Sequence, residues 1–137
     1  MDYRIGHLAY ATRDMKATLD FYTGVLGFRH VFSINDDQEK PWIEYLIGPD
    51  GRFIEFFYCN AAAPLRDEGY MHLCLEVADC AAAVAELRSK GIRITSDVSV
   101  GKDGNYQAWI LDPDGRSIEI MQLSPSSEQY QHRHALG

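Results

Sequence analysis

Two stretches of the sequence decide the fold: GPDGRFIEFF at residues 48–57 and DPDGRSIEIM at residues 112–121. Both contain Pro-Asp-Gly-Arg, followed one residue later by Ile-Glu. Pro-Asp-Gly is typical of a tight turn, and the apolar run after it is typical of a strand. Neither the turn nor the strand explains why a glutamate, Glu55 or Glu119, lies inside each apolar run.

The two stretches belong to a longer internal repeat. His7 in GHLAY corresponds to His72 in MHLCL at an offset of 65 residues, and Glu55 corresponds to Glu119 at an offset of 64. A change of one residue across the whole repeat fits a difference in loop length. The chain is therefore predicted to be a tandem duplication of a unit of roughly sixty residues.

Hydropathy alternation and helix signals predict an α+β fold made of two tandem βαβββ units. The predicted strands are 5–10, 28–34, 42–47 and 53–59 in the first unit and 71–77, 92–95, 106–111 and 117–123 in the second. The predicted helices are 14–26 and 79–90. One domain, 1–123, is expected, with units at about 3–60 and 70–123. Residues 60–69 are interpreted as a linker, and 124–137 as a loose C-terminal tail.

Composition excludes several classes of function. The formal net charge is −7 and the pI about 5.1, so nucleic acid and anionic membranes would be repelled. No leader-like start or membrane-length apolar run is present in these 137 residues, which favours a cytoplasmic protein. Three cysteines without metal-type spacing favour reduced thiols over a disulfide framework.

Four polar residues interrupt apolar strands at equivalent places in the two units. An ionised carboxylate facing a core is costly unless it is paired or bound to a cation. Arg52 and Arg116 are close enough in sequence to be such partners, and a single strand histidine is commonly a hydrogen-bonded core residue. The symmetric set instead favours a nitrogen–oxygen site for a divalent metal. Its predicted ligands are His7, Glu55, His72 and Glu119.

The duplicated units, the PDGRxIE strands and the His/Glu/His/Glu set resemble the vicinal oxygen chelate superfamily, and glyoxalase I in particular. The resemblance covers residues 5–123 and implies a sheet trough that opens on a metal such as nickel, cobalt, zinc, iron or manganese. It implies a lyase or isomerase that acts on a small oxygen-chelating substrate through an enediolate. It also implies a homodimer.

Within this resemblance, Glu119 is the expected catalytic base, with Glu55 on the opposite face of the substrate. Strand alternation adds an apolar substrate wall of Ala9, Phe57, Cys74 and Met121. Two positions where bacterial glyoxalase I usually has Arg and Asn to hold glutathione are Ala11 and Cys59 here. The sequence therefore does not decide whether glutathione or another thiol is used. The alternative functions are an iron-dependent dioxygenase and a non-catalytic, ligand-sequestering resistance protein.

Overall fold

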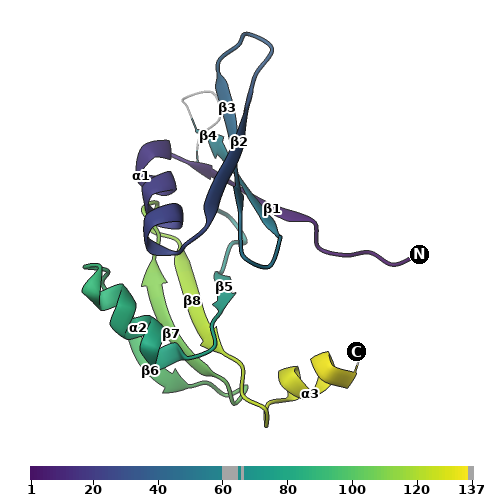
Figure 1. Ribbon diagram of the computed structural model, residues 1–137, viewed down its shortest axis with the longest axis vertical. Coiled ribbons are helices and arrows are strands. Elements are labelled where there is room, and N and C mark those ends of the chain that lie inside the picture. The colour runs from purple at the N-terminus through teal and green to yellow at the C-terminus, as the bar shows by residue number, and fades with distance from the viewer. Residues whose placement is uncertain (60–64, 66, 136–137) are drawn as a thin grey trace. The chain divides into compact units, whose positions relative to one another are not determined.

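The computed structural model describes residues 1–59, 65 and 67–135, and its contacts divide the chain into two compact units (Figure 1). The units are Met1–Gly69 and Tyr70–Gly137, and each contains one four-stranded sheet. The α+β class and the two tandem units predicted from the repeat are confirmed. Most of the expected linker lies outside the described residues.

Unit 1 follows the order expected from the sequence. It contains β1 (His7–Thr12), α1 (Met15–Leu19), the π-helical segment η1 (Asp20–Val25), β2 (Arg29–Asn35), β3 (Pro41–Ile47) and β4 (Phe53–Tyr58). The strands are ordered β1-β4-β3-β2, with β1 parallel to β4 and the other two pairs antiparallel. The strand with the first PDG motif is therefore central in its sheet.

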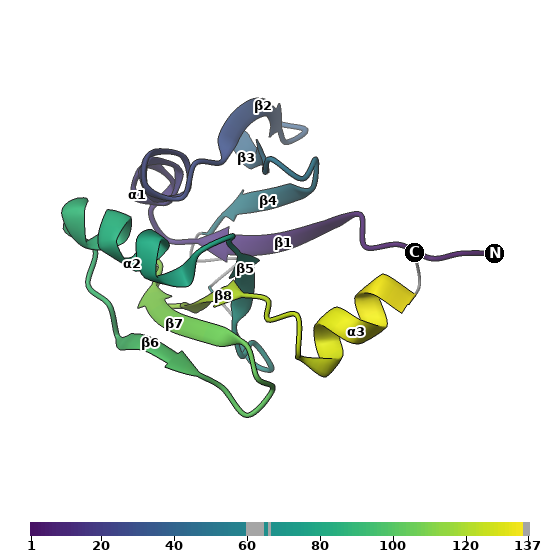
Figure 2. The same ribbon diagram turned by 60° about the horizontal axis from the view of Figure 1, so that its bottom comes forward.

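Unit 2 repeats this topology. It contains β5 (Leu73–Glu76), α2 (Cys80–Ser89), β6 (Ser96–Val100), β7 (Tyr106–Leu111), β8 (Ser117–Gln122) and an additional helix α3 (Glu128–Ala135). The strands are ordered β5-β8-β7-β6, again with one parallel pair, β5 and β8 (Figure 2). The strand with the second PDG motif is central too.

The same local signals build both units. Asp14 and Asp79 precede the helices, and their carboxylates accept backbone hydrogen bonds from Ala17 at 3.0 Å and Ala82 at 2.9 Å. These bonds satisfy amides that have no partner within the helix. The PDG turns require a left-handed glycine, and Gly51 and Gly115 have φ of 78° and 85°. The sequence therefore fixes where each helix begins and where each β-hairpin turns.

Each central strand has one face in a core. In β4, Phe56 is fully buried, and its ring lies 4.7 Å from the ring of Tyr22 in η1. In β8, Ile118 and Ile120 are buried, and α2 packs on this sheet. Because successive strand residues face opposite sides, Glu55 and Glu119 lie on the faces away from these helices.

Several predicted boundaries differ from the structure, beginning with the first strand, which runs over His7–Thr12 and not 5–10. The first helix is divided into α1 and η1. The strand predicted at 92–95 is wrong, because the Ile92 amide still closes the end of α2 by bonding to the Leu87 carbonyl at 3.0 Å. The strand begins instead at Ser96. The first strand of unit 2 begins at Leu73, so His72 lies just before it and not within it.

The C-terminal segment differs from the loose tail expected at 124–137. Helix α3 occupies Glu128–Ala135, and Arg133 forms an ion pair with Glu76 at 2.7 Å. Buried Asn105 accepts a hydrogen bond from the Ser124 amide at 2.8 Å and donates one to Gln129 at 2.9 Å. Polar contacts, which hydropathy patterns do not report, therefore attach this segment to unit 2.

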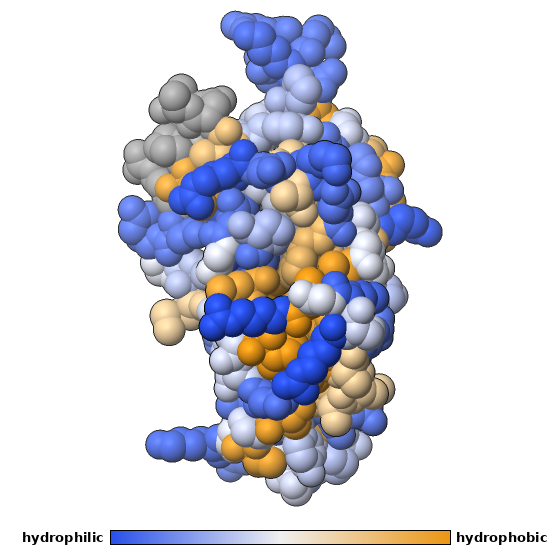
Figure 3. Space-filling view, turned by 90° about the vertical axis from the view of Figure 1, so that its left-hand side faces the viewer, coloured by the Kyte–Doolittle hydropathy of each residue, from blue (hydrophilic) through white to orange (hydrophobic). Residues whose placement is uncertain are grey.

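No helix in the described ranges is long and apolar enough to cross a membrane. On the face shown in Figure 3, hydrophilic side chains lie among hydrophobic ones.

Replacing Asn105 with Ala tests the attachment of the C-terminal segment. The change leaves the Ser124 amide without its acceptor, so we expect the free energy of unfolding to fall by about 1–3 kcal/mol. Urea unfolding followed by circular dichroism measures it. Asn35→Ala, at an exposed strand end, is the control and should have little effect. Equal stability of the two variants would contradict this role for Asn105.

Candidate functional site

The two glutamates occupy the same register in the two sheets. Glu55 in β4 lies opposite Ala9 on one side and Tyr45 on the other. Glu119 in β8 lies opposite Cys74 and Trp109 in the same way. Both are buried, at 6% and 8% exposure. The duplication thus repeats the burial of a carboxylate and its position between two equivalent strands, although the residues opposite it differ.

A histidine approaches each buried carboxylate. His7 Nε2 lies 2.7 Å from Glu55 Oε2, and His72 Nε2 lies 3.1 Å from Glu119 Oε2. The imidazoles are more exposed than the carboxylates, with 54% and 37% of the two side chains accessible. The structure therefore brings together the predicted site residues as two His–Glu pairs, one within each unit.

The arginines near these glutamates in sequence point elsewhere. Arg52 donates to the Ile5 carbonyl at 2.8 Å. Arg116 is buried beside Asp114 at 3.5 Å and Asp112 at 3.9 Å. Within the part of the chain that the structure describes, no lysine or arginine forms an ion pair with Glu55 or Glu119. Compensation by an arginine of the described residues, the ordinary explanation for a buried carboxylate, does not apply to them.

Other groups next to the carboxylates differ between the units. The hydroxyl of Tyr45 hydrogen-bonds to Glu55, which raises the pKa of Tyr45. Desolvation, followed by the charge of Glu119 and a hydrogen bond to it, raises the pKa of the Cys74 thiol to about 12. The His72 ring meets Trp109 edge-on, with centroids 4.9 Å apart. Neither Tyr45 nor Trp109 was identified from the sequence, although counting back from each PDG turn places both opposite a glutamate.

The predicted wall residues share the faces of the glutamates. Ala9 and Phe57 lie on the Glu55 face of unit 1, and Cys74 and Met121 on the Glu119 face of unit 2. Sequence reasoning missed two aromatic neighbours in unit 1. Trp42 meets Phe57 edge-to-face at 5.7 Å and is 46% exposed, and Phe32 stacks on Tyr45.

A third His–Glu pair lies on the helix-covered face of unit 1. His30 Nε2 is 2.7 Å from Glu44 Oε2, and Glu44 also accepts hydrogen bonds from Ser33 and Tyr58. Burial would raise the pKa of Glu44, but these three bonds outweigh it, and the pKa is lowered. Glu44 is therefore compensated within the protein.

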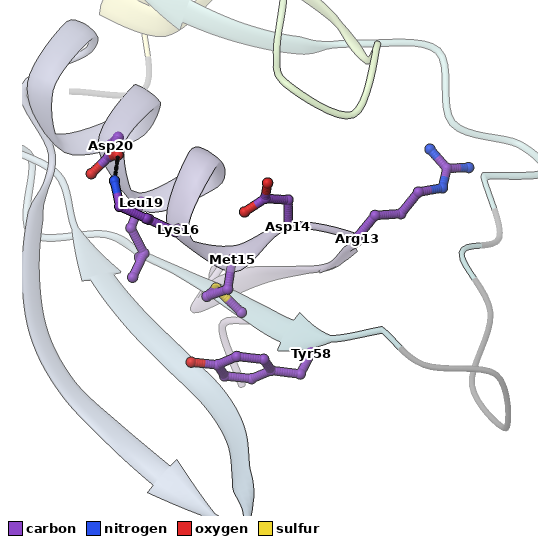
Figure 4. Close-up of a pocket in the computed structure, with 7 residues that line it drawn as sticks. All are labelled: Arg13, Asp14, Met15, Lys16, Leu19, Asp20 and Tyr58. Carbon is purple, nitrogen blue, oxygen red and sulfur yellow. Dashed lines mark hydrogen bonds and ion pairs between the residues drawn. The ribbon is translucent and has the colours of Figure 1, made fainter.

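The ring of Tyr58 lines a surface hollow together with residues at the start of α1 and the Lys16–Asp20 ion pair (Figure 4). Tyr58 alternates with Phe57 along β4, so this hollow does not belong to the face that holds Glu55.

The donor atoms of the two matched pairs suit a metal ion. Imidazole nitrogen and carboxylate oxygen together favour divalent transition metals over calcium or magnesium. Each pair supplies two such donors. Among residues 1–59, 65 and 67–135, the structure has no cluster of three or more His, Cys, Asp or Glu residues that could hold a metal. The set fits a metal chemically, and a four-ligand site would need both pairs.

A duplicated βαβββ unit with a His–Glu pair on each sheet defines a class of protein. The chain belongs to the Glyoxalase/Bleomycin resistance protein/Dioxygenase superfamily, whose family model matches residues 4–120.

Among its curated relatives is the lactoylglutathione lyase GLX1 of Arabidopsis thaliana, which is 28% identical over 93% of this chain. This chain spans 47% of that relative, less than half its length. A lactoylglutathione lyase of Pseudomonas putida is also 28% identical, over 87% of this chain and 84% of the relative. Among solved structures, a virulence protein of Salmonella typhimurium has a TM-score of 0.67 at 28% identity, covering 90% of this chain and 99% of its own.

The environment of Cys74 predicts slow alkylation of an exposed residue. With a pKa of about 12, the Cys74 thiol is almost entirely protonated at pH 8, whereas an ordinary cysteine has a pKa of about 8.5. We expect iodoacetamide to modify Cys74 far more slowly in the folded, metal-free protein than in urea, as followed by peptide mass spectrometry. Glu119→Gln removes a negative charge, so it should accelerate the reaction. Equal rates in the folded and unfolded protein would contradict the raised pKa.

Proposed function

We propose that this protein is a metal-dependent lyase or isomerase of glyoxalase I type. The observation that carries the proposal is the matched His–Glu pair in each unit, with a buried carboxylate that pairs with no lysine or arginine among the described residues. The names of the curated relatives, lactoylglutathione lyases, support the same class. In this proposal, one divalent transition metal binds His7, Glu55, His72 and Glu119.

The residues then have distinct roles. When bound, the metal supplies Lewis-acid stabilisation of negative charge on substrate oxygens. His7 and His72 donate neutral imidazole nitrogens. Glu119 would take a proton from a hydroxyl-bearing carbon next to a carbonyl, which gives an enediolate, and would return the proton to the adjacent carbon. Glu55 faces the other side of the substrate.

The faces beside the pairs suggest how a small substrate is held. Ala9, Phe57, Cys74 and Met121 form the proposed wall, and Trp42 extends it in unit 1. These side chains suit an apolar substrate part. Ala11 and Cys59 provide no charged group for glutathione. In this proposal, glutathione is therefore not bound through these two positions as it is in bacterial glyoxalase I.

Removing both proposed histidine ligands tests the metal site. We expect His7→Ala combined with His72→Ala to abolish stoichiometric binding of Ni²⁺, Co²⁺ or Zn²⁺, because two of four donors are lost. Elemental analysis and calorimetric titration measure the stoichiometry. Sedimentation of the native sample gives the number of chains per metal, and we expect a homodimer.

His30→Ala is the matched control for this experiment, because it removes a histidine at the same 2.7 Å from a buried glutamate. It should leave the stoichiometry unchanged. If the double variant binds metal as well as the native protein does, the metal site is elsewhere.

Glu119→Gln separates an enzyme from a ligand-binding protein. It keeps a neutral oxygen donor but removes the base, so we expect turnover to fall by about 10²–10⁴-fold. Assays use methylglyoxal with a panel of thiols, with native protein and variant loaded with the same metal. Glu44→Gln changes a buried glutamate on the other face of a sheet and is the control.

The outcomes distinguish the alternatives. Full turnover by Glu119→Gln would show that Glu119 is not the base and would make Glu55 the candidate. Oxygen uptake by the iron-loaded native protein would favour the dioxygenase. Ligand binding without turnover, equal in both proteins, would favour sequestration.

A further inference from the structure

Helix α3 has no counterpart among the described residues of unit 1, and it lies beyond the end of β8, away from α2 (Figure 2). Its first turn is attached to Asn105, which is fully buried and donates a hydrogen bond to Gln129 at 2.9 Å. Arg133 follows Gln129 by four residues, so both side chains project from the same face of the helix. This face is turned toward the sheet of unit 2, because Arg133 reaches Glu76 at the end of β5.

Glu76 shares a sheet face with Glu119. Cys74 lies opposite Glu119 across the β5–β8 pair, and Glu76 follows Cys74 by two residues. Alternate strand residues point to the same side, so all three lie on the face away from α2. Two strand residues span roughly 7 Å. The ion pair between Glu76 and Arg133 therefore lies on the face that holds Glu119, a short distance along the strand.

Arg133 uses only part of its guanidinium group in this ion pair. One nitrogen, Nη1, donates to both Glu76 oxygens, at 3.0 Å and 2.7 Å. Among the described residues, no acceptor binds Nε or Nη2 of Arg133. The side chain is 48% exposed, so these donors are open to solvent. The edge formed by Nε and Nη2 is the planar fork that binds a carboxylate through two parallel hydrogen bonds.

The charge of the chain gives this free edge a consequence. The formal net charge is −7, so the protein as a whole repels an anionic substrate. Recognition of such a substrate requires a local cation with unused donors. Glu76 offsets part of the charge of Arg133, but it also holds the guanidinium in one orientation with the free edge outward. The repeat places Ala11 at the position in β1 that corresponds to Glu76, so unit 1 has no carboxylate there to hold a cation.

We propose that Arg133 is a specificity-determining residue that binds the carboxylate of an anionic substrate through Nε and Nη2, while the oxygen-chelating part of the substrate lies at the His72–Glu119 pair. The inference rests on the proposed function and adds the charge and length of the substrate. Because roughly 7 Å of strand separates Glu76 from Cys74, the carboxylate and the chelating oxygens belong to opposite ends of the substrate.

Two thiols of matched size test the proposal. Mercaptopropionate and mercaptopropanol form adducts with methylglyoxal that differ in one carboxylate. We expect Arg133→Gln to lower kcat/KM for the carboxylate adduct by about 10–100-fold, mainly through KM, because a charge-assisted contact is lost. The neutral adduct should be turned over as by the native protein. Arg133→Lys keeps the charge but not the fork, so its loss should be intermediate.

Arg88→Gln is the matched control. Arg88 in α2 forms an ion pair with Asp97 at 2.8 Å and is 53% exposed, but α2 covers the other face of the sheet. It should leave both adducts unaffected. If Arg133→Gln impairs both adducts equally, Arg133 acts only by attaching α3, and the proposal is overturned. Unchanged turnover of the carboxylate adduct would overturn it too.

A second measurement needs neither metal nor turnover. In metal-free, isotope-labelled protein at constant ionic strength, millimolar mercaptopropionate should shift the NMR resonance of the Arg133 Nε–H group, and mercaptopropanol should not. The spectrum of Arg133→Gln identifies this resonance. If native protein turns over neither adduct, the proposed function fails by itself, and this titration still decides the role of Arg133. A resonance that does not move, or that responds alike to both thiols, would overturn that role.

Discussion

A buried carboxylate in the central strand of a sheet needs a compensating group, and this chain has two such carboxylates, Glu55 and Glu119. Glu55 and Glu119 are buried, and no arginine or lysine in the described residues forms an ion pair with either. The protein instead presents an imidazole to each carboxylate, at 2.7 Å and 3.1 Å. The topology buries both glutamates, because each lies in a central strand with a parallel strand on one side and an antiparallel strand on the other.

Much of the fold could be predicted because its signals are local and occur twice. The PDG turns locate two β-hairpins, Asp14 and Asp79 locate two helix starts, and the matched offsets reveal the duplication. The errors arise where other interactions override local pattern. Ile92 and Ile94 alternate like a strand, but the Ile92 amide bonds to the end of α2, and the first bond to β7 comes only at Thr95, whose amide donates to the Trp109 carbonyl. The attachment of α3 depends on Asn105, a buried polar residue far from the helix in sequence.

The candidate site was predictable in its principal residues but not in their surroundings. Glu55 and Glu119 stand out because charge is unexpected inside an apolar strand. Tyr45 and Trp109 do not stand out, because aromatic residues are common in strands. Their importance depends on cross-strand register, which places each opposite a glutamate. His72 was expected within a strand and precedes it, so the end of a strand and not its interior presents that imidazole.

The cluster around Glu44 has a consequence for recognising ligands in protein structures and for designing them. Unit 1 contains two His–Glu pairs with the same 2.7 Å separation, so proximity alone cannot separate a ligand pair from a structural one. The difference lies in the hydrogen bonds that each carboxylate already accepts. The oxygens of Glu44 are in contact with two hydroxyls and an imidazole. One sheet thus allows a comparison between Glu44, which has several hydrogen-bond partners, and Glu55, which has fewer. Removing hydroxyls around Glu44 would be a direct way to engineer new coordinating capacity into an existing fold.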